Sequence, residues 1–493
     1  MPALDASAQT VHATPSAVAP VFVRTGRVSA ASDDAAPPFA ADRLDLLLDG
    51  ESPLTPDWTA WAEILAFGAP LAGRTPFQEI RRLQPGESAG RHGDEVTIRR
   101  GTWDWAEIDP EPGLDPRALT DDVLEVLRAR LGRDADVGPL LPMLSGGRDS
   151  RLLTALAHQV RPEELVAWTT SSDTGTSMEE LAAARTAQVL GVEQRIVPAA
   201  VEDFPRDARD YGRAVHHMAS FHIWLMPVSR AIAEHSAASG GVVLDGLGGG
   251  VFLGGGFPDD PALEGEGGSA PDVDAVVASR FARLGRYLDA AEDILPPGLG
   301  EELAERARAD FEDVALPFAQ HPNGATLTAY LTRTLPGISL APVKVLGSAA
   351  PTRTPIMADE VVRQALRVPA EQKQDGLWYP HLLERADARL ASLPTAADRT
   401  RRRQHVRRIE SLESAGWLRG LILGSPAGDL LSDRMREAPV EAWAEELSRT
   451  KPQHLVRGLA LLALWLHEHR DRLAQAEPDV LLPPRAAGEA RHG

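Results

Sequence analysis

The chain has 493 residues, a formal net charge of −20 and no cysteine. The lack of cysteine excludes disulfides, thiolate metal sites and cysteine nucleophiles. The acidic charge balance argues against a nucleic-acid interface, which needs clustered lysine and arginine. Its length predicts two or three domains, and the lack of a basic, apolar leader predicts a cytoplasmic protein.

Composition divides the chain into four stretches. Residues 1–40 are rich in alanine, serine and proline, which predicts a loose extension. Short apolar runs between turn residues predict a small α+β domain over 41–112. A second domain is expected over 113–477, opening with a charged helix near 119–131, and residues 478–493 are predicted to be a disordered tail.

Strand and helix patterns alternate in the first half of the second domain. Apolar runs predict strands, and amphipathic patterns predict helices at 150–160 and 178–190; the strands are expected at 139–144, 165–170, 194–199 and 240–246. This alternation predicts a parallel sheet with helices on both faces, whose ligands bind at the carboxyl ends of the strands. Pro142 removes a ladder donor from the first strand, so we expect that strand to begin late.

The region from about residue 272 to 477 is expected to be mainly helical. Its most apolar segment, His454–His469, is too short to cross a bilayer and contains Arg457. We therefore predict a buried helix there and no membrane contact.

A serine-glycine turn, LSGGRDS at Leu144–Ser150, follows the first predicted strand and leads into a helix. Glycines let backbone N–H groups approach a phosphate, and the helix N-terminus favours negative charge. The Ser145 and Ser150 hydroxyls add donors. Asp149 would repel phosphates unless a cation intervenes, and Mg²⁺ bridging it to a pyrophosphate resolves that conflict. The alternative is a flexible turn in which Asp149 or Ser150 caps the helix.

The turn resembles the pyrophosphate loop of the N-type ATP pyrophosphatases. Other segments narrow the resemblance to the asparagine synthetase-like group; they are GRTPFQEIRRLQPGE at 73–87, the strand at 165–170, the helix at 178–192, VVLDGLGGGVFLGGG at 242–256 and TRTPIMADEVVRQALRVPAEQK at 352–373. The resemblance implies an α/β fold: a parallel-sheet ATP pyrophosphatase domain (adenine nucleotide alpha hydrolase-like) with a helical C-terminal extension. The preceding α+β unit is similar to a remnant of an Ntn-type amidotransferase domain.

By this resemblance the protein is an amide-forming ligase that uses ATP and Mg²⁺. Such enzymes activate a carboxylate as an acyl-adenylate, release pyrophosphate, and let ammonia or an amine attack. The implied nucleotide-binding residues are Leu144, Ser145, Gly146, Gly147, Asp149, Ser150, Thr169, Thr170, Asp245 and Gly246. Asp149 and Asp245 are the implied Mg²⁺ ligands, and Asp149, Lys373 and Arg385 the implied catalytic residues. The implied partners are small-molecule or peptide carboxylates and amines, with a homodimer or a biosynthetic partner enzyme as further expectations.

The chain departs from the family pattern at three places. Glutamine-hydrolysing members carry a cysteine after the initiator methionine, whereas Pro2 stands here, so the nitrogen must arrive as ammonia or as an amine. Gly250 stands where the second glycine motif normally carries an acidic residue, and Asp245 is the nearest carboxylate. No lysine occurs at 378–380, so Lys344, Lys373 or an arginine such as Arg385 would have to replace it.

Two other features admit two interpretations each. The arginine run at 399–408 either binds pyrophosphate or an acidic substrate or, as is more common, forms a helix face paired with acids. The histidines at 216, 217 and 222 either deprotonate an amine or pack as ordinary side chains, which we favour.

Two other functions compete with the ligase. A catalytically degenerate relative would bind nucleotide or a partner enzyme, and Gly250 together with the missing lysine favours it. A tRNA-modifying pyrophosphatase would share the loop, but the acidic charge and the lack of cysteine weigh against it.

Overall fold

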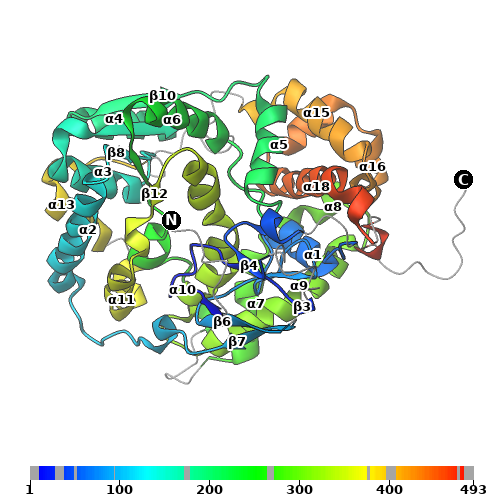
Figure 1. Cartoon of the computed structure of the whole chain (residues 1–493), viewed down its shortest axis with the longest axis horizontal. Coiled ribbons are helices and arrows are strands. Elements are labelled where there is room, and N and C mark those ends of the chain that lie inside the picture. The colour runs from blue at the N-terminus through cyan, green and yellow to red at the C-terminus, as the bar shows by residue number, and fades with distance from the viewer. Residues whose placement is uncertain are drawn as a thin grey trace, which may run out of the picture.

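The computed structural model describes residues 10–27, 38–48, 53–93, 95–170, 178–263, 271–374, 378–395, 407–474 and 478–481. Figure 1 shows a parallel sheet with its helices on one side of the molecule and a large helical region on the other, with the N-terminal strands below that region.

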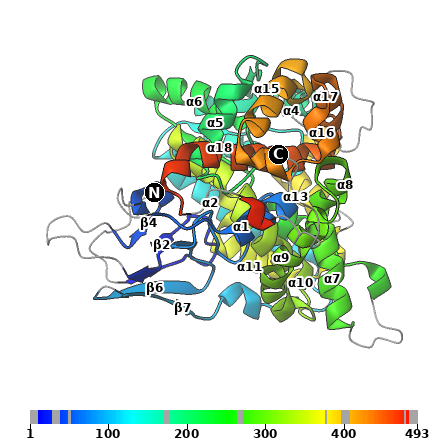
Figure 2. The same ribbon diagram turned by 90° about the vertical axis from the view of Figure 1, so that its right-hand side faces the viewer.

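Two small antiparallel sheets form the N-terminal part, on one side of the molecule in Figure 2. The first has the order β1-β6-β7-β3 and the second β4-β2-β5. Their bounds are β1 (Thr10–His12), β2 (Phe22–Arg24), β3 (Gly26–Arg27), β4 (Ala40–Ala41), β5 (Ile80–Arg82), β6 (Glu87–His92) and β7 (Glu95–Arg100).

The expected loose extension over residues 1–40 is therefore wrong for the described residues 10–27 and 38–40. Three of the strands lie in this stretch, with part of a fourth. Phe22 and Val23 are fully buried, and Val11 nearly so. Val11 stands alone and Val21–Val23 is a run of only three apolar residues, so composition hides strands that cross-strand pairing stabilises. Residues 1–9 and 28–37 lie outside the described part of the chain.

The predicted parallel sheet is present, which confirms the α/β fold class. Its strands are β8 (Leu140–Pro142), β9 (Val166–Thr170), β10 (Glu193–Val197), β11 (Val242–Leu244) and β12 (Thr352–Arg353). All pairs are parallel, and bridges from Leu140 to Leu165 and from Met143 to Trp168 join β8 to β9. The order is thus β12-β11-β8-β9-β10, and the direction of winding reverses between β8 and β11. Ligands of such sheets bind at this switch point.

Pro142 lies at the end of β8, which begins at Leu140, so the expected late start of this strand is wrong. The N–H groups of one strand alternate in direction, and that of Leu144 donates to Trp168 O of β9 at 2.7 Å. The missing donor at Pro142 faces the same side, while Met143 N–H donates to Leu244 O of β11 at 2.8 Å. Proline therefore interrupts only the β8–β9 ladder.

Helices cover the sheet and continue into the C-terminal region. Those of the first group pack around the sheet, directly or through another helix; they are α2 (Thr120–Ala135), α3 (Arg148–Val160), α4 (Met178–Leu190), α6 (Leu225–Ser239), α11 (Asp359–Arg367), α12 (Ala370–Gln374), α13 (Trp378–Ala386) and α14 (Ala388–Ala391). The second group is α7 (Val273–Leu284), α8 (Ala291–Ile294), α9 (Leu299–Ala315), α10 (Gly324–Ala329), α15 (Leu412–Leu423), α16 (Asp433–Glu437), α17 (Val440–Leu447) and α18 (Thr450–His469). Helix α5 (Phe204–Ala214) contacts α6 of the first group and two C-terminal helices of the second.

Helix α18 is the buried helix that the sequence predicts. Its residues from Leu455 to Leu466 are almost all inaccessible to solvent. In the part of the chain that the structure describes, no helix combines the length and apolar character needed to cross a membrane.

The N-terminal part and the C-terminal helices share one hydrophobic core. Helix α1 (Trp58–Phe67) packs against α9 and α18, with the rings of Trp61 and Trp465 5.1 Å apart. The short helix Pro478–Leu481 also contacts α1 and α9, and Leu481 is fully buried, so the disordered tail expected from residue 478 is wrong over these four residues.

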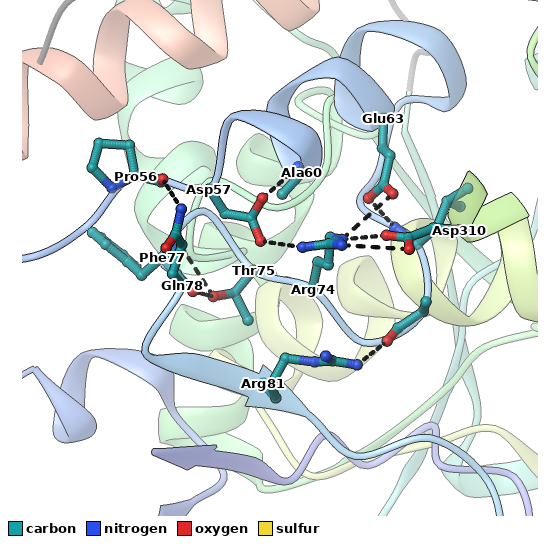
Figure 3. A network of polar contacts seen from close by, with 12 residues as sticks. Pro56, Asp57, Ala60, Glu63, Arg74, Thr75, Phe77, Gln78, Arg81 and Asp310 are labelled. Carbon is teal, nitrogen blue, oxygen red and sulfur yellow. Dashed lines mark hydrogen bonds and ion pairs between the residues drawn. The ribbon is translucent and has the colours of Figure 1, made fainter. Parts of the chain in front are cut away.

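Figure 3 shows the polar contacts that hold this junction. Arg74 lies 2.9 Å from Asp57 Oδ2 and 3.9 Å from Glu63 Oε1, and it also pairs with Asp310 of α9. Asp57 caps α1 by accepting the N–H of Ala60 at 3.0 Å. Burial, together with the neighbouring Asp310, raises the pKa of Glu63 well above its ordinary value. Residues far apart in the sequence thus form one packed unit across the predicted boundary at residue 112.

Candidate functional site

A cavity of about 680 Å³ opens at the switch point between β8 and β11. One side, which we call the sheet wall, is formed by the strand ends, their glycine turns and Glu179 of α4, and it contains Leu144, Ser145, Asp149, Ser150, Thr169, Thr170, Asp245 and Gly246. The other side, which we call the helical wall, includes His222, Trp224, Phe257 and Arg333. Eight of the ten residues that the sequence assigns to the nucleotide thus line one cavity.

The serine-glycine turn is held by its own hydrogen bonds. Ser150 Oγ accepts the N–H of Ser145 at 3.0 Å and lies 2.9 Å from Ser145 Oγ. Gly147 N–H donates to Ser145 Oγ at 3.2 Å. Gly147 is the N-cap of α3 and no side chain caps this helix, so capping by Asp149 or Ser150 does not account for the turn. The two hydroxyls rigidify the loop, which leaves its shape ready for a ligand.

Glu179, in the first turn of α4, contacts this turn and was not predicted. Its Oε2 accepts the N–H of Gly146 at 3.0 Å. Burial raises the pKa of the Glu179 carboxyl, although the Gly146 hydrogen bond opposes that rise. The Glu179 carboxylate therefore accepts the Gly146 N–H, which is the donor that a bound phosphate oxygen would use. From the sequence, glutamates at a helix start are explained by the helix dipole alone.

Asp149 is fixed by two donors from distant segments. Its Oδ2 accepts the N–H of Gly250 at 3.0 Å, and its Oδ1 accepts the hydroxyl of Tyr379 at 2.5 Å. Desolvation raises the pKa of Asp149, and both hydrogen bonds oppose the rise. Tyr379 lies in the segment where the family resemblance places a lysine, so that segment does reach the site, but with a hydroxyl.

The second glycine motif packs directly against Asp149. A Cβ at Gly249 would lie 2.3 Å from Asp149 Cγ, so only glycine fits there. At Gly250 a Cβ would lie 3.9 Å from Asp149 Oδ2, which is an ordinary contact. An acidic residue at 250 would therefore stand beside Asp149, and the chain has glycine there instead.

Asp245 follows β11 and lines the same cavity as Asp149. Its Oδ1 accepts the N–H of Leu247 at 2.8 Å. Burial, and to a lesser degree the charge of Asp149, raise the pKa of Asp245 to about 6. Two neighbouring half-buried carboxylates are a donor set that Mg²⁺ prefers, with water and phosphate supplying its remaining ligands. Among the described residues, no cluster of three or more side chains that could ligate a metal occurs.

The threonines at the end of β9 hold the backbone of the sheet wall. Thr169 Oγ1 donates to Leu144 O at 2.7 Å, and Thr170 Oγ1 donates to Trp224 O at 3.0 Å. The second bond ties β9 to the helical wall.

Lys373 and Arg385, the predicted catalytic cations, do not line the cavity. Lys373 is fully buried and its Nζ donates to Ala365 O at 2.9 Å, with its pKa lowered by burial to about 8. Arg385 pairs with Asp121 through contacts of 2.7 and 2.9 Å at the surface. The sequence motif that ends at Lys373 is present, but hydrogen bonding and pairing direct both cations away from the cavity. Lys344, another candidate, lines a separate cavity of about 550 Å³.

The three histidines do not share one pocket. His216 and His217 line the separate cavity, and His222 lines the helical wall. Burial and the charges of Arg333 and Arg457 lower the pKa of His222 to about 3, so its imidazole is neutral at physiological pH and too weak a base to deprotonate an amine.

The described end of the arginine run pairs with acids, as we favoured. Arg407 Nη1 lies 3.1 Å from Glu180 Oε1, and Arg408 Nη1 lies 2.5 Å from Asp207 Oδ2. Residues 399–406 of the run lie outside the described residues.

Arg333 is the cation that the sequence did not reveal. Of the described residues that line the cavity, it alone carries a permanent positive charge. It lies in the helical segment Tyr330–Ile338, where a single arginine among threonines looks like an ordinary polar position.

Comparison with known proteins gives one family match. The family model described as asparagine synthase matches residues 119–480, which is more than half of the chain. No curated protein sequence matches significantly. Among solved structures, an NH3-dependent NAD synthetase from Campylobacter jejuni subsp. jejuni NCTC 11168, in complex with the nitrate ion, is 14% identical, with 40% of this chain and 96% of that chain covered and a TM-score of 0.20. Values this low support no inference about fold or function.

Proposed function

The chain belongs to the asparagine synthase family, and from this premise we propose that it is an ATP-dependent amide-forming ligase. In the proposed reaction a substrate carboxylate attacks the α-phosphorus of ATP, pyrophosphate leaves, and ammonia or an amine then displaces AMP from the acyl-adenylate. One observation carries the proposal. Ser145 and Ser150 of the serine-glycine turn line a single cavity with Asp149 and Asp245 at the switch point of the sheet, and Gly146 and Gly147 lie behind them.

The residues of the sheet wall have separate tasks in this proposal. The N–H groups of Gly146 and Gly147, next to this wall at the N-terminus of α3, receive phosphate oxygens once Glu179 withdraws from Gly146 and Ser145 Oγ from Gly147. Asp149 and Asp245 would hold Mg²⁺, which when bound neutralises charge on the pyrophosphate. Tyr379 and Gly250 keep Asp149 oriented toward the cavity.

The nitrogen source is proposed to be free ammonia or an amine on a second substrate. The sequence has no cysteine for glutamine hydrolysis by the amidotransferase route. The N-terminal sheets then act as a scaffold, and a specialised acceptor such as a natural product, a peptide or a sugar suits the chain better than housekeeping asparagine synthesis.

Pyrophosphate exchange tests the proposal. Purified protein with Mg²⁺, ATP, labelled pyrophosphate and a panel of carboxylic acids is expected to exchange label into ATP with at least one acid. Asp149→Ala is expected to abolish exchange, whereas Asp136→Ala, at an exposed aspartate of a surface ion pair, leaves it unchanged. Equal exchange by wild type and Asp149→Ala would contradict the assignment of the site.

A second candidate is a non-catalytic relative that binds nucleotide or a partner enzyme. The contact of Glu179 with Gly146 and the lack of a carboxylate at Gly250 favour it. If wild type exchanges with no acid and Gly250→Asp gains exchange, this second candidate is correct and the ligase is not.

A further inference from the structure

We propose that Arg333 and His222 form an oxyanion subsite in the helical wall, which holds a carboxylate or phosphoryl group of the bound substrates. This inference rests on the proposed function, because it assigns the helical wall to the same reaction. It adds a binding group that the glycine turn and the two aspartates do not supply.

The charge on Arg333 has no partner in the described part of the chain. Its guanidinium carbon lies 5.1 Å from the ring centre of Phe257, and none of the described residues forms an ion pair or a hydrogen bond with it. Arg333 is half-buried, and this burial lowers the pKa of its guanidinium. A desolvated charge without a partner is unfavourable. An anionic ligand in the cavity would relieve it.

Two fully buried arginines of this chain, Arg280 and Arg82, have protein partners for their guanidinium groups. Arg280 pairs with both oxygens of Asp259 at 2.8 and 2.6 Å. Arg82 donates to carbonyl oxygens. Arg333 thus differs from these two arginines, because it has no such partner among the described residues and it lines the cavity.

The surroundings of Arg333 are positive. The groups that act on its pKa besides burial are Tyr287 and Arg286, and neither is a carboxylate. Burial and the charges of Arg333 and Arg457 lower the pKa of His222. Burial and the same two charges, together with that of Arg286, lower the pKa of His454. The helical wall thus carries the positive charge of Arg333, whereas the sheet wall carries the carboxyl groups of Asp149, Glu179 and Asp245.

His222 supplies a neutral hydrogen-bonding group beside this charge. Its backbone N–H is held by the Tyr211 hydroxyl at 3.2 Å, and its Nδ1 has no hydrogen-bond partner among the described residues. A neutral imidazole donates from one ring nitrogen. Together, a guanidinium and an imidazole N–H provide two-point recognition of an oxyanion.

The N-terminal part braces the segment that carries Arg333. Arg82 of β5 donates to Leu335 O at 2.9 Å and to Ala17 O at 3.0 Å. Leu335 lies in the same helical segment as Arg333. The N-terminal part is thereby connected to the helical wall of the site.

Titration calorimetry on Arg333→Met tests the subsite, with MgATP and succinate as separate probes. Loss of the guanidinium is expected to lower the affinity for one of the two probes at least tenfold relative to wild type. Weaker MgATP binding identifies a phosphoryl ligand, and weaker succinate binding identifies a carboxylate. Arg308→Met is the matched control, because Arg308 also lies over a phenylalanine ring, 4.5 Å from that of Phe281, but outside the cavity.

Unchanged affinity for both probes in Arg333→Met overturns the subsite. Thermal denaturation of each variant checks folding; if the methionine variant does not fold, Arg333→Lys, which keeps the charge but loses the planar fork, is expected to give a smaller loss of the same kind. The two proposals fail differently. Wild type that does not bind MgATP contradicts the ligase, and if succinate then still binds in an Arg333-dependent manner the subsite stands.

Discussion

The two walls of the cavity differ in how their polar groups are satisfied. On the sheet wall, Glu179 accepts from Gly146, and Asp149 accepts from Gly250 and Tyr379. On the helical wall, Arg333 has no ion-pair or hydrogen-bond partner among the described residues. The sheet wall is thus preorganised around carboxylates that suit a cation, and the helical wall offers a charge that suits an anion. A reaction that separates Mg²⁺-pyrophosphate from an acyl-adenylate needs both kinds of wall.

The largest expected effect comes from breaking the sheet wall at Gly249. In Gly249→Ala the new Cβ would lie 2.3 Å from Asp149 Cγ and must displace that carboxylate. We expect MgATP affinity and pyrophosphate exchange to fall more than 100-fold, which corresponds to about 3 kcal/mol. Gly132→Ala is the control, because nothing lies within 4 Å of its Cβ in helix α2. Affinity within twofold of wild type would contradict the packing.

Breaking the support of the helical wall is expected to affect stability more than chemistry. Arg82→Met leaves Leu335 O and Ala17 O without their charged donor. The free energy of unfolding is expected to fall by roughly 3 kcal/mol, measured by urea denaturation. Arg91→Met removes a half-exposed side chain whose hydrogen bond reaches only Gly93 O, two residues away, and should change the free energy of unfolding by less than about 0.5 kcal/mol. Equal stability of the two variants would show that Arg82 does not brace this wall.

Removing a carboxylate from the sheet wall is expected to stabilise the protein, although it also removes one ligand of the proposed Mg²⁺ site. Burial raises the pKa of Asp245 from 3.8 to about 6, so the folded state binds more protons than the unfolded state between these values. The negative charge of Asp245 therefore lowers the free energy of unfolding above about pH 6 and has no effect on it below about pH 4. Asp245→Asn is expected to gain roughly 2 kcal/mol at pH 7, with the gain vanishing near pH 4.

Thermal or urea denaturation in the absence of Mg²⁺ measures this gain across pH. A variant less stable than wild type at pH 7 would be inconsistent with a raised pKa at Asp245.

The smallest expected effect sharpens the role of Tyr379. Tyr379→Phe removes the donor to Asp149 Oδ1, and because that hydrogen bond lowers the pKa of Asp149, the pKa rises in the variant. As the pH falls, MgATP binding should therefore begin to weaken at a higher pH than in wild type, and the variant should lose about 1 kcal/mol of binding free energy in that pH range. Calorimetric affinities between pH 5 and 8 measure it. If binding weakens at the same pH as in wild type, or at a lower pH, Tyr379 does not lower the pKa of Asp149.

The sheet wall was largely predictable, because its residues belong to contiguous motifs. The turn at Ser145–Ser150 and Asp245 follow strands whose alternation with helices already implies a shared edge. Glu179 and Tyr379 were not predictable, since their contacts depend on how α4 and α13 pack on the loop. The place of Arg333 depends on packing in the same way.

The predicted catalytic cations show the limit of motif matching. Lys373 occupies the expected position in its motif, yet its Nζ is directed to Ala365 O. A motif fixes the path of the backbone, but where a long side chain ends depends on neighbours that the motif does not contain. The strands within residues 10–27 show the same limit, because they are stabilised by partners as distant as β6 and β5.

The most direct measurement is a structure of the protein with Mg²⁺ and α,β-methylene ATP. We predict phosphate oxygens at the N–H groups of Gly146 and Gly147, the metal between Asp149 and Asp245, and Glu179 withdrawn from Gly146. Nucleotide bound elsewhere, with the Glu179 carboxylate still accepting from Gly146, would contradict the account.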